Sequence, residues 1–187
     1  MSATMKLHDD IASGNTGGTG DMKVAPTTER QTLIDGLNHD LAGEHQAILM
    51  YINYSAKLTG PFRRELRALF QAEIADETGH AQFLSDKIAA MGGDPTTESR
   101  PVPSVKEPRQ MLACALDAET HAIADYTTRI GQAEVCGEIG LKVALENQLA
   151  DETRHKEEIE RIIAGWFDFQ PDRPLKASTL RDVGGEG

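Results

Sequence analysis

Residues 75–80 read Ala-Asp-Glu-Thr-Gly-His, and residues 150–155 read Ala-Asp-Glu-Thr-Arg-His. Five of the six positions are identical, and the two blocks lie 75 residues apart. Each block holds a Glu and a His three residues apart, a spacing that places both side chains on one face of a helix. Each block can therefore offer a carboxylate and an imidazole together to a metal ion. These residues are Glu77, His80, Glu152 and His155.

The duplication extends upstream of both blocks. A glutamate precedes the Glu of each block by 33 residues, and a tyrosine follows that upstream glutamate by seven; they are Glu44 and Tyr51 in the first copy, and Glu119 and Tyr126 in the second. Midway between upstream glutamate and block, the first copy has Gly60-Pro61 and the second has the turn-like segment 131–140. In an antiparallel helical hairpin, residues equally far from the turn lie level, so each upstream glutamate should face its block about 25 Å from the turn.

Apolar residues at helical spacing predict helices over about 28–59, 61–91, 107–134 and 138–168. Segment 92–108 has two Gly and four Pro, and about 16 extended residues can cover about 50 Å, the length of a long helix. The prediction is an all-α four-helix bundle of two helical hairpins joined by a long crossover. The bundle should occupy 27–169, between a flexible N-terminal tail over 1–26 and a polar C-terminal tail over 170–187 with room for a short helix.

The composition and net charge of the chain limit the kinds of partner that it could bind. The chain has 187 residues and a formal net charge of −11, which disfavours nucleic acid and anionic lipid and favours cations. No stretch approaches the roughly 18 apolar residues that a membrane helix needs, and the N-terminus lacks the apolar core of a secretory signal. Cys114 and Cys136 would lie about 33 Å apart along one helix, too far for a disulfide. These features favour a cytoplasmic protein without a membrane or nucleic-acid partner.

Two hairpins packed together would bring four glutamates and two histidines into one layer of the core. Four buried carboxylates need compensating charge, and two divalent cations supply four positive charges while both imidazoles bind neutral. Carboxylates mixed with imidazole suit iron or manganese better than a soft metal. A Glu from each of two helices, with Glu-x-x-His from each of the other two, is the di-iron carboxylate pattern of such bundles.

The stretches GEHQAILMY (43–51), ADETGH, MLACALDAETHAIADY (111–126) and ADETRH make the chain resemble the ferritin-like superfamily, most closely bacterioferritins and Dps-like ferritins. The resemblance covers about residues 30–165. It implies that Glu44 and His80 are terminal ligands of one iron, and that Glu119 and His155 are terminal ligands of the other. It further implies that two glutamates bridge both irons and two tyrosines hydrogen-bond to ligand carboxylates; these are Glu77, Glu152, Tyr51 and Tyr126.

Other positions refine the resemblance. Metal-bound histidines usually donate their second N–H to a carboxylate or carbonyl, so we expect Asp76 to orient His155 and Asp151 to orient His80 across the bundle. Thr78 stands where bacterioferritins have their haem-binding Met, which argues against haem. Large ferritin cages have a fifth helix, and residues 170–187 show only a weak helical pattern. The resemblance therefore favours a homo-oligomeric shell of 12 subunits over one of 24, with a smaller oligomer left open. His39, His45 and His121 lack repeat partners, so they should serve at the surface or in packing.

The leading hypothesis is a di-iron ferroxidase that oxidises Fe(II) with O2 or H2O2, for iron storage or detoxification in an oligomeric shell. One alternative on the same ligands is a dimanganese catalase or a di-iron oxidase of an organic substrate. A second alternative is a DNA-protecting or scaffold shell that forms no mineral; the absence of basic arms weighs against DNA binding.

Overall fold

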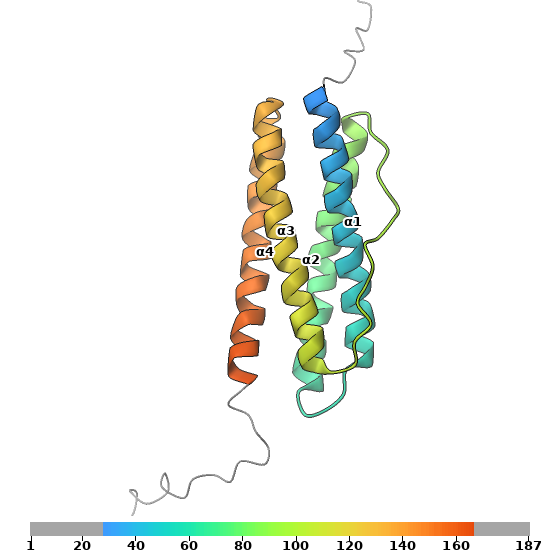
Figure 1. Cartoon of the computed structure of the whole chain (residues 1–187), viewed down its shortest axis with the longest axis vertical. Coiled ribbons are helices and arrows are strands. Elements are labelled where there is room, and N and C mark those ends of the chain that lie inside the picture. The colour runs from blue at the N-terminus through green and yellow to red at the C-terminus, as the bar shows by residue number, and fades with distance from the viewer. Residues whose placement is uncertain (1–27, 167–187) are drawn as a thin grey trace, which may run out of the picture.

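A computed structural model describes residues 28–166 of the chain, and that part contains four α-helices and no strand (Figure 1). The helices are α1 (Thr28–Lys57), α2 (Arg63–Ala90), α3 (Pro108–Val135) and α4 (Ile139–Trp166). The predicted all-α four-helix bundle is confirmed. The predictions made for the tails lie outside the described residues.

The connections give the predicted topology. Helices α1 and α2 form one hairpin and α3 and α4 form the other, and the crossover runs the length of the bundle beside α1, so that α3 starts at the same end as α2 (Figure 1). Hydrogen bonds attach the crossover to α1, from Arg100 N to Ala42 O at 3.0 Å and from Tyr54 Oη to Pro103 O at 2.7 Å. The crossover therefore covers one side of the bundle.

The hairpin turns account for small differences in helix ends. Helix α1 ends two residues before the predicted position, and α2 begins two residues after it. Gly60 adopts φ 88°, a left-handed conformation that glycine reaches without a steric cost, and its carbonyl accepts from Arg63 N at 3.2 Å. In the second hairpin Gly137 has φ 72° directly after α3.

The apolar core consists of two clusters, one toward each end of the bundle. The first joins the start of α1 and the end of α2 to the end of α3 and the start of α4, with Leu37, Leu84 and Leu145 among its members. The second joins the opposite halves of the same helices, with Phe70, Leu112 and Ile159 among its members. The four glutamates and two histidines of the repeat fall in sequence between these clusters on every helix. Apolar packing on both sides thus holds a charged layer at mid-bundle.

Two further sequence predictions can be compared with the structure. Cys114 and Cys136 are both free and partly buried, as expected for two thiols far apart, one within α3 and one just past its end. No helix within residues 28–166 has the length and apolar character needed to cross a bilayer.

Candidate metal centre

The six candidate ligands of the repeat converge in one buried layer. Each comes from the middle of a helix, with one glutamate from α1, one from α3, and a Glu-x-x-His pair from each of α2 and α4. Each is at most 7% exposed, so their charges are almost fully removed from water. These residues are Glu44, Glu77, His80, Glu119, Glu152 and His155.

The donor atoms form two overlapping groups. One contains Glu44 and His80, the other contains Glu119 and His155, and both contain Glu77 and Glu152. Within each group the potential ligand atoms lie within 4.8 Å of one another. Two groups that share two carboxylates are the arrangement needed for two adjacent cations bridged by those carboxylates.

Both imidazoles present Nδ1 to the cluster. His80 Nδ1 lies 2.8 Å from Glu152 Oε1 and 3.4 Å from Glu77 Oε2, and His155 Nδ1 lies 3.9 Å from Glu119 Oε2. Both Nδ1 atoms are buried without a hydrogen-bond partner, as is an oxygen of each of the three glutamates just named. Buried polar atoms are normally satisfied in folded proteins. Metal ions coordinated by these atoms would satisfy them, so the residues fit a di-metal group.

The electrostatics of the cluster also favour cations. Burial raises the pKa of Glu77 and of Glu119 well above the usual range for a glutamate. Burial opposes a charged imidazole at His80, yet the nearby carboxylates of Glu152, Glu44 and Glu77 outweigh it and raise the pKa of His80 to about 12. Without metal, the layer therefore retains protons to limit its negative charge. Cation binding would displace those protons, because metal ligands must be deprotonated.

The two tyrosines of the repeat connect the hairpins. Tyr51 on α1 donates its hydroxyl to Glu119 on α3, and Tyr126 on α3 donates to Glu44 on α1. Burial raises the pKa of both phenols well above the usual range, so each remains a donor. Each tyrosine holds one oxygen of an upstream glutamate and leaves the other oxygen available to a cation.

Carboxylates also lie behind the histidines. Asp76 Oδ2 lies 3.4 Å from His155 Nε2, and Asp151 Oδ2 lies 3.9 Å from His80 Nε2. The structure adds Glu73, which the sequence interpretation missed and whose Oε2 lies 3.1 Å from His155 Nε2. A signal existed, because both copies have a polar residue four positions before the block glutamate. On an acidic helix such a glutamate resembles ordinary surface charge.

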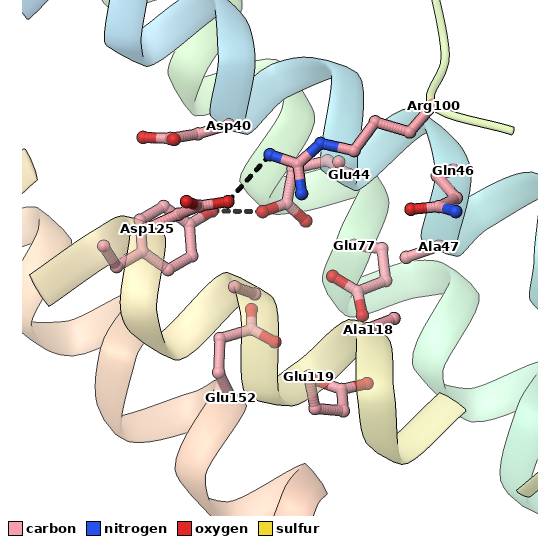
Figure 2. Close-up of a pocket in the computed structure, with 13 residues that line it drawn as sticks. Asp40, Glu44, Gln46, Ala47, Glu77, Arg100, Ala118, Glu119, Asp125 and Glu152 are labelled. Atoms are coloured by element: carbon pink, nitrogen blue, oxygen red, sulfur yellow. Dashed lines mark hydrogen bonds and ion pairs between the residues drawn. The ribbon is translucent and has the colours of Figure 1, made fainter. Parts of the chain in front are cut away.

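A small cavity of about 20 Å³ adjoins the glutamates at the seam between α1 and α3 (Figure 2). Small side chains on both helices, Ala47 and Ala118 among them, leave this space open. Arg100 extends from the crossover across the same seam, where its Nη2 donates to Asp125 Oδ2 at 2.7 Å and to His39 O at 2.9 Å. A cavity of this size can hold about one water-sized molecule. The glutamate layer thus has room for one small molecule beside it.

Within residues 28–166, the three histidines without repeat partners lie outside the layer. His39 Nε2 is 3.7 Å from Asp125 Oδ2, and His45 Nδ1 lies 3.0 Å from Glu98 O on the crossover. His121 contacts the carbonyl of Asp117 one turn earlier on α3. All three make contacts at or near the surface, in keeping with the surface or packing role expected from the sequence.

The fold and the donor set define a class of protein, the four-helix bundle with a candidate di-metal site of carboxylates and histidines. The family model described as a ferritin-like domain matches residues 34–166, and the chain belongs to that family. No match was found among curated protein sequences.

Two solved structures show the likeness in detail. A structure described as ferritin-like, diiron-carboxylate proteins from Bacillus anthracis strain Ames is 42% identical, with a TM-score of 0.72, and the match covers 73% of this chain and 99% of that one. The bacterioferritin of Desulfovibrio desulfuricans, described with its diiron site in different catalytic states, is 25% identical, with a TM-score of 0.70, and the match covers 75% of this chain and 83% of that one. The resemblance to di-iron ferritin-like proteins and bacterioferritins is therefore confirmed.

Proposed function

We propose that this protein is a ferroxidase, which binds two Fe(II) ions in the buried layer and oxidises them to Fe(III). The observation that carries the proposal is the pair of overlapping donor groups with Glu77 and Glu152 in common. Glu44 and His80 would complete one iron position, and Glu119 and His155 would complete the other. Related proteins with di-iron carboxylate sites support iron over manganese.

The proposed reaction balances as a two-electron oxidation. Two Fe(II) give up one electron each, and either one O2 takes both electrons with two protons to leave as H2O2, or one H2O2 takes them with two protons to leave as two waters. The chain supplies four carboxylates, which offset the positive charge that grows as iron is oxidised. Tyr51 and Tyr126 keep two of those carboxylates oriented throughout. The cavity beside Ala47 and Ala118 provides space for a small oxidant.

We further propose that the oxidised iron is stored in a homo-oligomeric shell in the cytoplasm, with 12 subunits favoured over 24. The net charge of −11 supports this role, because an acidic surface concentrates Fe(II) near the protein. The mass of the particle by light scattering, together with the iron retained per chain after oxidation, tests it. A monomer or dimer that retains no mineral would contradict storage while leaving the oxidation itself in place.

The oxidation is tested by adding Fe(II) anaerobically to the metal-free protein and mixing with O2 or H2O2 while Fe(III) absorbance is followed. We expect oxidation faster than that of Fe(II) in buffer, with a break at two irons per chain. His80→Ala and His155→Ala should each abolish that break. Glu65→Gln, which changes an exposed glutamate of α2, should preserve it.

Two results would contradict a ferroxidase. Oxidation no faster than in buffer would remove the proposed activity. Conversion of H2O2 to O2 by manganese-loaded protein, without accelerated Fe(II) oxidation, would instead favour a dimanganese catalase.

A further inference from the structure

The two histidines of the centre have unequal surroundings on their outer side. His155 Nε2 lies 3.1 Å from Glu73 Oε2 and 3.4 Å from Asp76 Oδ2. His80 Nε2 has Asp151 Oδ2 at the longer distance of 3.9 Å. The hairpins are matched in their inner ligands, so this difference comes from residues that the repeat does not conserve between its copies.

Two unmatched positions of the repeat account for the difference. The residue in the second copy that corresponds to Glu73 is Gln148, a buried neutral amide. The residue that corresponds to Gly79 is Arg154, whose Nη1 donates to Asp151 Oδ1 at 2.6 Å. Glu73 therefore gives His155 a carboxylate that has no equivalent beside His80. Arg154 engages the aspartate that faces His80, and its Nη2 also lies 3.3 Å from His155 Nε2 and 4.0 Å from Asp76 Oδ2.

The outer nitrogen matters because Nδ1 of both rings faces the cluster. A ring that binds metal through Nδ1 keeps its hydrogen on Nε2 and can donate it outward. A carboxylate that accepts this hydrogen fixes the ring and makes it a stronger ligand, and loss of such a partner typically lowers metal affinity by about 10–100-fold. Glu73 is well placed for this role, since its side chain is only 12% exposed and its Oε2 is buried.

We infer that Glu73 is a positioning residue for His155 and makes the two halves of the centre unequal. The half built by Glu119 and His155 binds its cation first and more tightly, and the half built by Glu44 and His80 fills second. This inference rests on the proposed di-metal site and adds to it an order of filling.

A different role for Glu73 would be ligation of a third cation together with Asp76 and His155, whose donor atoms also lie within 4.8 Å of one another. That cation would have to bind His155 through Nε2 while Nδ1 holds a cation of the centre. One imidazole would then bridge two metals after losing both ring protons. The positioning role needs only the proton that a metal-bound neutral ring already carries.

The test is a titration of the metal-free, full-length protein with Co(II), a divalent probe that O2 does not consume here, followed by calorimetry and by visible absorption of the bound ion. We expect two binding steps separated by about tenfold or more. His155→Ala should remove the tighter step, and His80→Ala should remove the weaker one.

Reciprocal substitutions then isolate Glu73. Glu73→Gln, which copies Gln148, should weaken the tighter step by about tenfold and bring the two steps together. Gln148→Glu, which copies Glu73, should strengthen the weaker step. Glu65→Gln removes an exposed glutamate of the same helix and should change neither step. A purely structural role for Glu73 would not make the two exchanges act in opposite directions.

The outcomes separate this inference from the proposed function. If Glu73→Gln left both Co(II) binding steps unchanged, or weakened both equally, the positioning role would be overturned while the proposed di-metal site would stand. A third step that disappears in Glu73→Gln would show a ligand instead of a positioning residue. Wild-type protein that binds fewer than two Co(II) ions would contradict the di-metal site itself.

Discussion

The two hairpins are alike where they face the metal centre and different toward the ends of the bundle. Toward the centre every candidate ligand and tyrosine of the first hairpin has its equivalent 75 residues later. One turn away this correspondence fails, because Asp40 corresponds to Ala115 and Arg129 corresponds to Tyr54. The proposed di-metal site would constrain both halves in the same way, whereas more than one set of side chains can pack at either end.

Those unmatched residues make the contacts on the two sides of the centre different. On one side of the centre, Arg129 donates to Asp40 through Nε at 2.8 Å and Nη2 at 3.2 Å, a buried bidentate pair between α3 and α1. On the other side, the equivalent positions Ala115 and Tyr54 belong to the second apolar cluster. Gly36 leaves room for the arginine of this pair, because a Cβ at position 36 would lie 1.9 Å from Arg129 Nη1. One end thus adds a buried ion pair to its apolar cluster, whereas the other end has apolar side chains at the equivalent positions.

The largest effect is expected from breaking the charged end. Arg129→Met leaves Asp40 buried and unpaired, which typically costs about 3–5 kcal/mol of stability. The double variant Asp40→Ala with Arg129→Tyr copies the apolar end and should recover most of that loss. Urea unfolding of metal-free protein measures both. If the double variant were as unstable as the single one, the two ends would not be interchangeable solutions.

The two tyrosines test the inner layer, where the two hairpins have equivalent residues. Tyr51→Phe and Tyr126→Phe each remove one hydroxyl from a buried glutamate, which we expect to destabilise the protein by about 1–3 kcal/mol, the cost of leaving a buried acceptor unsatisfied. The two losses should be equal, because the contacts are equivalent in the repeat. Thermal unfolding of both variants, with Tyr54→Phe as a tyrosine outside the layer, provides the measurement. Clearly unequal losses would mean that the inner layer is also asymmetric.

The same comparison explains what the sequence could predict. The bundle, its crossover and the six candidate ligands follow from helical spacing and from an exact offset between the two copies. Both features can be read directly from the sequence. The repeat gave only a weak signal for Glu73, and none for Arg100 or for the pair of Asp40 with Arg129. Their partners lie on other helices or on the crossover, and the rotation and packing of those elements decide which charged residues become buried.

A smaller effect should come from Arg154, which occupies the place of Gly79 in the repeat. Arg154→Ala frees the Asp151 carboxylate to accept from His80 Nε2. We expect the weaker Co(II) step to strengthen by less than tenfold, or less than about 1.4 kcal/mol, because the arginine is largely exposed. Calorimetry of the variant beside Lys156→Ala, a neighbouring cation on α4, measures the change. A weaker second step would show that Arg154 supports this half of the centre.

The smallest effect is expected at Glu138, in the turn between α3 and α4, which lies 2.7 Å from Lys87 Nζ and 3.2 Å from Arg30 Nη1. The equivalent residue in the first hairpin is Arg63, so this link joins the hairpins at one end only. Hydrogen bonding to Lys87 lowers the pKa of Glu138, so its contribution is complete above the unfolded-state pKa near 4.5 and disappears as the pH falls through the lower folded-state value. Glu138→Gln should therefore cost about 0.2–1 kcal/mol at pH 7, the range for exposed pairs, and progressively less below pH 4.5. Urea unfolding of wild type and variant across this pH range gives the difference, and a gap that persisted in acid would point to packing of the side chain instead of its charge.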